Sequence, residues 1–246
     1  MFSFFQKKTF LIDHLNGFID IHNHILPGID DGAKTVEESI KLIKEFSEFG
    51  VTNFIATPHI MDNYYPNNLK TVTKSLNKLN KQLKGEKLNN VTITAAAEHM
   101  IDANFEVILE KGEVIPILKN YLLVEMSYLQ ASINFENAIQ KIAERRFFPI
   151  LAHPERYVYL HSKFGKYEKY KSKGIMFQLN LLSLSNYYGK DVQQMANKLL
   201  NEGLLDFVGT DVHNIRQLNS LKEIKLTKKQ LDKVLPIIDT TIQSFY

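Results

Sequence analysis

His22 and His24 are separated by a single residue, a spacing that could build half of a metal site. Side chains two positions apart on a β-strand point to the same face, so both imidazoles would project together. Pro27-Gly28 ends the strand, and Asp31 follows in the turn, where its carboxylate could add a hard oxygen ligand beside the two nitrogens. A lone pair of this kind also occurs on ordinary polar strand faces. The metal hypothesis therefore depends on further ligands elsewhere in the chain.

Metal-capable side chains do recur along the chain, each at the end of a predicted strand. They lie roughly 25 to 40 residues apart, which is the length of one strand–helix unit. The set consists of His22 with His24, His59, Glu98, Glu125, His153, and Asp211 with His213. In a closed parallel barrel, the C-terminal ends of the strands meet at one mouth, where such folds build their active sites. We therefore expect several separate segments to contribute to one site.

The elements that must position these residues alternate between strand and helix patterns. Thr35 and Glu38 form a capping box that begins a helix, and Gly50 ends it. Predicted strands cover residues 18–22, 51–56, 91–96, 121–124, 148–152, 175–180 and 207–210. Further helices are predicted at about 69–83, 104–111, 135–145, 192–201 and 227–243. This alternation predicts an α/β barrel of parallel strands.

A chain of 246 residues can bury one large core, so we expect a single domain over residues 1–246. Within it, residues 1–16 would be an N-terminal extension and residues 227–246 a C-terminal helix. Residues 1–8 have an apolar start but no small-residue cleavage site, so they do not resemble a signal peptide. We expect this tip to pack against the domain, with contact to a membrane surface or a partner as the alternative. No apolar run approaches the roughly 20 residues of a membrane helix, and the expected location is cytoplasmic.

The composition excludes several kinds of chemistry. The chain contains no cysteine, which excludes disulfides, thiolate zinc sites and any phosphatase with a cysteine nucleophile. A metal would have to be bound by His, Asp and Glu. The net charge of +3 is too small to indicate a nucleic-acid-binding protein, whose basic residues usually cluster on one face.

At the metal-capable positions the sequence resembles the PHP (polymerase and histidinol phosphatase) superfamily. More narrowly, it is similar to the bacterial capsule-associated tyrosine phosphatases that dephosphorylate the tyrosine autokinases of polysaccharide export. The resemblance spans about residues 17–216 and implies a distorted seven-stranded (β/α) TIM-like barrel of PHP type. The motifs behind it are Asp20-Ile-His-Asn-His-Ile-Leu-Pro-Gly-Ile-Asp-Asp-Gly32, Ala56-Thr-Pro-His59, Ala97-Glu98, Val124-Glu125, Ala152-His-Pro-Glu-Arg156 and Thr210-Asp-x-His213.

The resemblance implies three divalent metal ions and assigns their ligands. The first ion would be held by His22, His24, Glu98 and Asp211; the second by Glu98, Glu125 and His153, with Glu98 bridging; and the third by Asp31, His59 and His213. Manganese is the implied metal, with iron or zinc as alternatives, because mixed imidazole and carboxylate ligands suit all of them.

The resemblance also implies two phosphoryl-binding arginines. Arg156 matches the first of them directly. Arg216 is a looser match, because the second family arginine lies a few residues further beyond the last histidine. The implied substrate is phosphotyrosine in the tail of a bacterial tyrosine autokinase of capsular polysaccharide or exopolysaccharide synthesis.

The chemistry of phosphate monoesters favours metals independently. Their hydrolysis needs up to about 10²¹-fold acceleration, whereas one general acid or base gives about 10²- to 10⁴-fold. We therefore expect a hydroxide bridging the first two metal ions to attack phosphorus, with the third ion and Arg156 neutralising the phosphoryl oxygens. A phenolate, whose parent pKa is near 10, leaves with little proton assistance. The sequence identifies no general acid.

Several polar residues near the ligands have more ordinary interpretations. Asp20 is expected to orient a histidine rather than to bind metal. Gln178 and Asn180 share one face of a strand and could either fill the barrel or support the ligands. His99 should face away from the side on which Glu98 points.

Other features have no place in the predicted site. His14 and His161 are expected at the surface. The Tyr/Lys-rich segment 156–173 could bind an acidic phosphotyrosine-bearing tail, or it could be a solvated helix face. The lysines between residues 70 and 84 are expected to be such a face.

Three other functions remain open at this point. Histidinol-phosphate phosphatase is the alternative within the same fold, and a PHP-type nuclease would need a nucleic-acid groove. A degenerate binding module is the non-enzyme alternative. The complete ligand set argues against the last.

Overall fold

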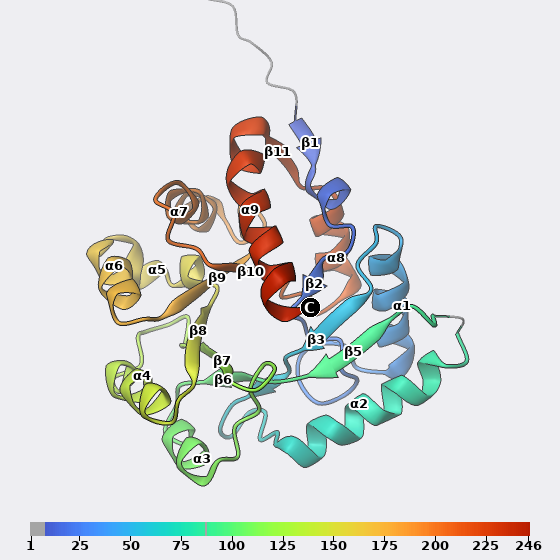
Figure 1. The fold of residues 1–246 in the computed structure, drawn as a ribbon, viewed down its shortest axis with the longest axis horizontal. Coiled ribbons are helices and arrows are strands. Elements are labelled where there is room, and N and C mark those ends of the chain that lie inside the picture. The colour runs from blue at the N-terminus through green and yellow to red at the C-terminus, as the bar shows by residue number, and fades with distance from the viewer. Residues whose placement is uncertain (1–7, 87) are drawn as a thin grey trace, which may run out of the picture.

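The computed structural model describes residues 8–86 and 88–246. The predicted apolar tip therefore lies almost entirely outside the described residues. Figure 1 shows the helices arranged around the strands, with α9 crossing in front of them. The strands are β1 (Lys8–Phe10), β2 (Ile19–Asp20), β3 (Asn53–Ala56), β4 (His59–Ile60), β5 (Thr92–Ala95), β6 (Glu98–Met100), β7 (Tyr121–Glu125), β8 (Phe148–Ala152), β9 (Met176–Asn180), β10 (Phe207–Gly209) and β11 (Lys225–Thr227).

The helices account for most of the outer layer. They are α1 (Val36–Ser47), α2 (Leu69–Leu83), α3 (Phe105–Lys111), α4 (Phe135–Glu144), α5 (Val158–His161), α6 (Gly165–Ser172), α7 (Lys190–Asn201), α8 (Ile215–Lys222) and α9 (Lys228–Phe245). Short 3₁₀ turns cover Leu11–His14, Pro154–Arg156 and Leu181–Leu184. Within the described ranges, every helix is too short or too polar to cross a lipid bilayer.

The strands pair in parallel, as the alternating pattern predicts. One sheet has the order β10-β9-β8-β7-β6-β4, and another has the order β2-β3-β5. A separate antiparallel pair, β1 with β11, was not predicted. The predicted helix at residues 69–83 is confirmed as α2, and Thr35 is confirmed as the N-cap of α1, since its hydroxyl oxygen accepts a hydrogen bond from the Glu38 amide at 3.3 Å.

The second and third predicted strands are present as β3 and β5, and each is followed after a short break by a further strand that was not predicted. β3 and β5 pair side by side, and their continuations β4 and β6 pair with His59 opposite Glu98. Pro58 lies in the first break, and proline has no amide hydrogen to donate to a ladder. His59 does lie just past the end of β3, as predicted, and it also begins the short strand β4, which was not predicted.

The two parallel sheets are linked at the C-terminal ends of β2 and β10, the first and last of the parallel strands. Asn23 forms a parallel bridge with Val212. The Asp211 amide donates to the His22 carbonyl at 2.7 Å, and the Thr57 amide donates to the Asn23 carbonyl at 3.0 Å. These bonds bring the segments after β2, β3 and β10 together.

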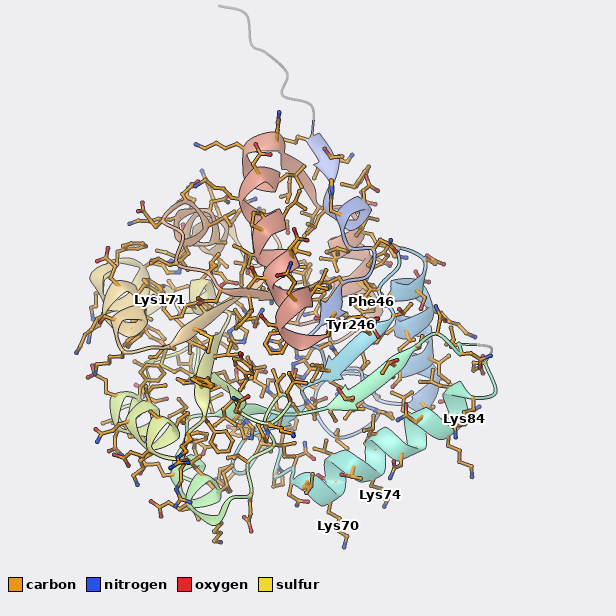
Figure 2. The ribbon with its side chains drawn as sticks, in the orientation of Figure 1. Phe46, Lys70, Lys74, Lys84, Lys171 and Tyr246 are labelled. Atoms are coloured by element: carbon orange, nitrogen blue, oxygen red, sulfur yellow. The ribbon has the colours of Figure 1, made fainter. Side chains whose placement is uncertain are left out.

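Apolar strand residues form the layer that supports these segments. Ile55, Leu123, Ile150 and Phe207 belong to one buried cluster, and Phe245 at the end of α9 packs against the same cluster. A larger core fills the space between the strands and the surrounding helices. Figure 2 shows Lys70, Lys74 and Lys84 pointing away from the molecule on α2, as expected for a solvated face.

Candidate metal centre

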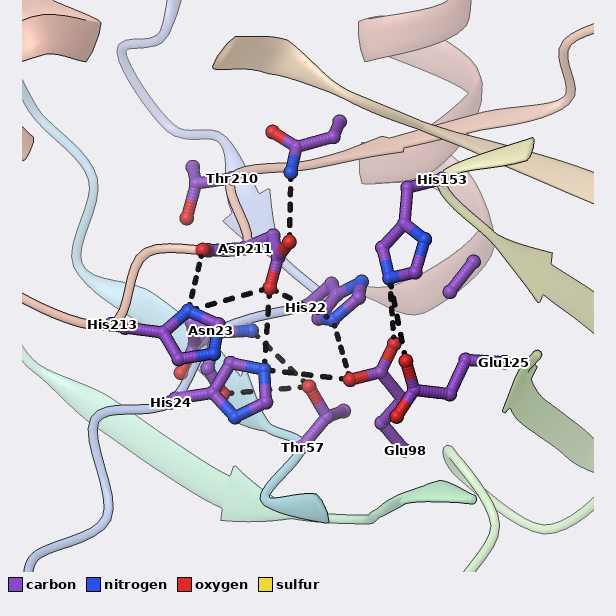
Figure 3. Close-up of polar contacts among 12 residues, drawn as sticks. His22, Asn23, His24, Thr57, Glu98, Glu125, His153, Thr210, Asp211 and His213 are labelled. Carbon is purple, nitrogen blue, oxygen red and sulfur yellow. Dashed lines mark hydrogen bonds and ion pairs between the residues drawn. The ribbon is translucent and has the colours of Figure 1, made fainter. Parts of the chain in front are cut away.

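Nine side chains converge where the strands of the parallel sheets end, and we call them the metal centre. Two follow β2, one begins β4, one begins β6, one ends β7, one follows β8 and two follow β10. The ninth lies in the loop between β2 and α1. In chain order they are His22, His24, Asp31, His59, Glu98, Glu125, His153, Asp211 and His213. Figure 3 shows His22, His24, His153 and His213 turned toward the carboxylates of Glu98, Glu125 and Asp211.

The most buried part of the metal centre joins two imidazoles to two carboxylates. His22 Nε2 lies 3.2 Å from Glu98 Oε2 and 3.3 Å from Asp211 Oδ1. His24 Nε2 lies 3.5 Å and 3.3 Å from the same two oxygens. One donor atom from each residue falls within 4.8 Å of the others, which is close enough for all four to bind one ion.

A second part is built around Glu98 and Glu125. His59 Nδ1 lies 3.1 Å from Glu98 Oε2 and 3.0 Å from Glu125 Oε1. His153 Nε2 lies 3.0 Å from Glu98 Oε1 but 3.9 Å from Glu125 Oε2. Glu98 thus belongs to both the first and the second part of the metal centre. His59, which the resemblance assigns to the third ion, also contacts Glu125 in the second part.

The third part faces solvent. Asp31 Oδ1 lies 3.4 Å from His59 Nε2 and 3.5 Å from His213 Nε2, and its side chain is 49% exposed. The ring of His24 stacks on that of His213 with centroids 3.8 Å apart. His59 therefore has one nitrogen toward Asp31 and the other toward the buried carboxylates, so it lies between two parts of the centre.

Two buried side chains fix the orientation of the first imidazole pair. Gln178 Oε1 lies 2.7 Å from His22 Nδ1, and Asp30 Oδ2 lies 2.8 Å from His24 Nδ1. Holding Nδ1 in this way directs each Nε2 toward the shared carboxylates. Gln178 therefore supports a ligand, and the supporting role of Asp30 was missed, although it lies beside Asp31 in the predicted turn.

Asp20 contacts the His22 backbone rather than an imidazole ring, since its Oδ1 accepts from the His22 amide at 3.4 Å. Its carboxylate accepts hydrogen bonds from the Thr210 hydroxyl at 2.6 Å and the Thr210 amide at 3.0 Å. Burial raises the pKa of Asp20 to about 6, although these bonds oppose the shift. Asp20 thus ties the start of the His22 segment to the segment that precedes Asp211.

Close backbone packing explains two glycines beside the histidines. A Cβ atom at Gly209 would lie 2.6 Å from the Cβ of His22, and one at Gly32 would lie 2.1 Å from the carbonyl oxygen of His24. Larger residues would displace the imidazoles. His153 and Asp211 have positive φ values of 35° and 53°, a strained conformation for non-glycine residues that is common at functional sites.

The electrostatics of the metal centre favour ionised carboxylates. Burial alone would raise the pKa of Asp211, but the His22 and His213 imidazoles hold it well below its usual range. Burial likewise opposes ionisation of Glu98, whose pKa is nevertheless held well below its usual range by His22 and His59. Burial lowers the pKa of His153, so this imidazole keeps a free lone pair.

The donor set fits divalent metal ions. Among the described residues, the buried atoms His22 Nε2, His24 Nε2, His59 Nδ1, Glu98 Oε2 and Glu125 Oε1 have no hydrogen-bond partner. Buried polar atoms are normally paired, and these five point at one another at distances of 3.0 to 3.5 Å. Cations shared within the group His22, His24, Glu98 and Asp211 and the group His59, Glu98 and Glu125 would satisfy these atoms. Imidazole with carboxylate is a donor set typical of manganese, iron and zinc.

The two predicted arginines lie in different environments. Arg156 Nη1 donates to Asp211 Oδ2 at 2.6 Å, which places its guanidinium at the edge of the metal centre. Arg216 is exposed on α8 and lines a separate depression of ≈ 610 Å³ with Tyr187 and Ile215. The structure thus brings Arg156 to the centre and leaves Arg216 outside its contacts.

The remaining histidines are structural. His99 faces away from the centre, with Nδ1 3.1 Å from the Leu123 carbonyl oxygen and Nε2 accepting from the Ile115 amide, and burial lowers its pKa to about 4. His14 and His161 are half-buried rather than at the open surface, and His161 Nε2 donates to the Glu155 carbonyl.

Three lysines in and directly after α6 form ion pairs within the scaffold. Lys169 and Lys173 both bind Glu136, and Lys171 binds Asp206. These three side chains therefore match a solvated helix face better than a substrate-binding rim.

The chain is similar to known proteins over most of its length. A family model described as "Capsular polysaccharide synthesis, CpsB/CapC" matches residues 18–234. The putative tyrosine-protein phosphatase CapC of Staphylococcus aureus is 28% identical over 225 residues, which cover 88% of each chain. The tyrosine-protein phosphatase YwqE of Bacillus subtilis is also 28% identical, over 90% of this chain and 88% of its own.

A solved structure of metal-dependent tyrosine phosphatases, YwqE from Bacillus subtilis and CpsB from Streptococcus pneumoniae, has the same fold. It aligns with a TM-score of 0.78 at 24% identity and covers 93% of this chain and 95% of its own.

Proposed function

Because the chain belongs to the CpsB/CapC family of capsular polysaccharide synthesis, we propose that it is a metal-dependent protein-tyrosine phosphatase. The proposed substrate is phosphotyrosine in the tail of a bacterial tyrosine autokinase. The observation that supports this most directly is the buried set of unpaired nitrogen and oxygen atoms that point at one another in the metal centre. The two curated relatives, both named tyrosine-protein phosphatases, support the same reaction.

We propose that the metal centre holds three divalent ions, with manganese as the preferred metal. His22, His24, Glu98 and Asp211 would hold the first, and Glu98 and Glu125 the second together with His153. Asp31, His59 and His213 would hold the third. The position of His59 beside Glu125 makes it a candidate ligand of the second ion as well.

Divalent ions bound there would lower the pKa of water and neutralise charge on the phosphoryl oxygens. The protein's own contribution is orientation. Gln178 and Asp30 hold the two imidazoles, and the opening beside Asp31, the most exposed ligand, admits the phosphoryl group. The Arg156 guanidinium, held by Asp211, would bind a phosphoryl oxygen with its remaining donors. The absence of cysteine excludes a phosphocysteine intermediate.

We propose further that the strands form one distorted seven-stranded barrel within a single domain over residues 1–246. The parallel bridge between Asn23 and Val212, which joins the end of the first strand to the end of the last, supports this closure. The split pairs β3/β4 and β5/β6 would each count as one barrel strand.

The test is a substrate panel run after metal analysis. Manganese-loaded protein should hydrolyse a phosphotyrosine peptide faster than a phosphoserine peptide or histidinol phosphate. Faster turnover of histidinol phosphate would contradict the proposal and support the alternative within the same fold. Inhibition of aryl phosphate hydrolysis by DNA would instead indicate a nuclease.

A further inference from the structure

We propose that Tyr128 and Tyr188 form an aromatic clamp that positions Arg156 for phosphoryl binding, an inference that rests on the proposed phosphatase function. The guanidinium carbon of Arg156 lies 4.3 Å from the ring centroid of Tyr128 and 4.2 Å from that of Tyr188. Both distances are well inside the roughly 6 Å range of cation–π attraction. Two rings from two different loops therefore contact one guanidinium.

The clamp is connected to the metal centre by hydrogen bonds. Arg156 Nη1 and Asn180 Nδ2 both donate to Asp211 Oδ2, at 2.6 and 2.8 Å. Asn180 Nδ2 also lies 3.3 Å from the Tyr188 hydroxyl oxygen, to which it donates. Asn180 thus couples the position of one clamp ring to a proposed ligand, which gives this residue of β9 a supporting role.

The other ring is held by tyrosines that have no other evident role. Tyr157 donates its hydroxyl to the Ala152 carbonyl at 3.1 Å and accepts from the Met126 amide at 3.0 Å. The Tyr159 hydroxyl donates to the Ser127 carbonyl at 3.0 Å. These bonds fasten the segment that leads into Tyr128. The aromatic part of the Tyr/Lys-rich segment therefore anchors a loop of the site.

The Tyr128 ring is also held by stacking on Tyr157. The Tyr128 ring stacks on Tyr157 with centroids 6.1 Å apart at an interplanar angle of 27°. Tyr188, Arg156, Tyr128 and Tyr157 consequently form one row of successive contacts. A row fixed at one end by backbone hydrogen bonds and at the other by Asn180 restricts the rotation of the guanidinium.

The restriction matters because arginine has a long side chain with considerable rotamer entropy. Ordering it before substrate binds removes that cost from the binding step. Aromatic rings cover guanidinium faces and leave the in-plane donors free, and Asp211 uses Nη1. The donors that remain lie along one edge, which suits a phosphoryl oxygen and would not suit a lysine ammonium.

The experiment compares Tyr188→Leu and Tyr128→Leu with the matched Tyr188→Phe and Tyr128→Phe variants, each made with Arg156 intact and with Arg156→Ala. The readouts are kcat/KM for a phosphotyrosine peptide and the affinity of manganese-loaded protein for orthophosphate. Tyr246→Leu, a substitution at an 89% exposed position, is the control, and melting temperatures verify folding.

Each leucine variant should lower kcat/KM and orthophosphate affinity roughly 10-fold, which is within the range of a lost cation–π contact. The phenylalanine variants keep the rings but lose the hydroxyl contacts to Asn180 and His153, so both quantities should fall less in them than in the leucine variants. With Arg156→Ala, the same leucine substitutions should change either quantity by less than about 2-fold, because coupled residues are not additive.

Two failures can be distinguished. The clamp proposal is wrong if the wild-type protein hydrolyses phosphotyrosine but the leucine substitutions lower kcat/KM and orthophosphate affinity as much in the Arg156→Ala background as with Arg156 present. If the wild-type protein hydrolyses no phosphotyrosine, yet leucine weakens orthophosphate binding only when Arg156 is present, the clamp stands and the proposed function is wrong.

Discussion

The side-chain oxygen of Gln178 lies 2.7 Å from Nδ1 of His22. The amide nitrogen of the same side chain donates to the Leu179 carbonyl at 2.6 Å, which fixes the orientation of the amide. Nδ1 of His22 must therefore carry a proton, which leaves Nε2, facing Glu98 and Asp211, as the nitrogen that can bind a metal ion. A buried amide on one strand thus sets the tautomer of a proposed ligand on another.

Gln178→Leu should weaken metal binding about 10- to 100-fold, because supporting hydrogen bonds of this kind orient the ligand and raise its basicity. Titration of the metal-free protein with manganese measures the effect. Gln140→Leu on the exposed face of α4 is the matched control and should bind like wild type. Equal affinities in the two variants would show that Gln178 only fills space.

A comparable prediction concerns Asp30, which supports His24 as Gln178 supports His22. Asp30→Ala should weaken manganese binding more than Asp30→Asn does, because asparagine keeps an oxygen that can accept from His24 Nδ1. The same carboxylate also accepts from the Gly32 and His59 amides, so Asp30→Ala should lower the melting temperature as well. An alanine variant that binds and melts like the asparagine variant would contradict this role.

His153→Ala should remove nearly all turnover while leaving the fold intact. The imidazole contacts Glu98 and the rings of Tyr128 and Tyr157, all of which remain in the variant, so its circular-dichroism spectrum should match that of the wild type. Metal analysis should show fewer bound ions per chain. His14→Ala, outside the metal centre, is the control, and wild-type rates in His153→Ala would refute the ligand assignment.

Metal affinity should increase with pH. Burial would lower the pKa of His24, but Asp30 and Asp211 raise it well above 6.5, and Glu125 and Glu98 do the same for the buried His59. In the metal-free protein both imidazoles therefore hold protons at neutral pH, and a metal ion must displace them. Manganese binding should tighten steadily from about pH 6 to about pH 8, with proton release visible by calorimetry. A dissociation constant independent of pH over this interval would contradict the pKa directions.

The three paired lysines in and directly after α6 should be dispensable for substrate binding. Since Glu136 and Asp206 already pair with them, replacing Lys169, Lys171 and Lys173 by serine should leave KM unchanged for both a phosphotyrosine peptide and a small aryl phosphate. A selective increase in KM for the peptide would restore the hypothesis of a basic substrate-binding rim.

Sequence patterns were sufficient to predict which residues converge at the site, because the positions of the strand ends determine that convergence. The apolar runs before Glu125, His153 and Asp211 predict their strands, and parallel pairing then places the residues together. The short strands β4 and β6 were not predictable from apolar periodicity alone, although Pro58 was a signal for the first break.

Long-range side-chain pairs were beyond sequence reasoning. Asp30 lies only six positions from His24, whereas Gln178 lies 156 positions from His22, and nothing in the local pattern says that it contacts that imidazole. The same holds for the two clamp tyrosines, since a pair of rings around one arginine depends on how two loops fold over the strand ends. Proximity in sequence correctly suggested a contact between Asp20 and His22, which is made to the backbone amide, but it gave no sign of the bonds to Thr210.

The most direct test of the metal centre is phosphotyrosine hydrolysis by one protein sample before chelation, after chelation and after manganese is added back. The account predicts that the rate disappears on chelation, returns with manganese, and follows the number of ions bound per chain. An undiminished rate in demonstrably metal-free protein would contradict it.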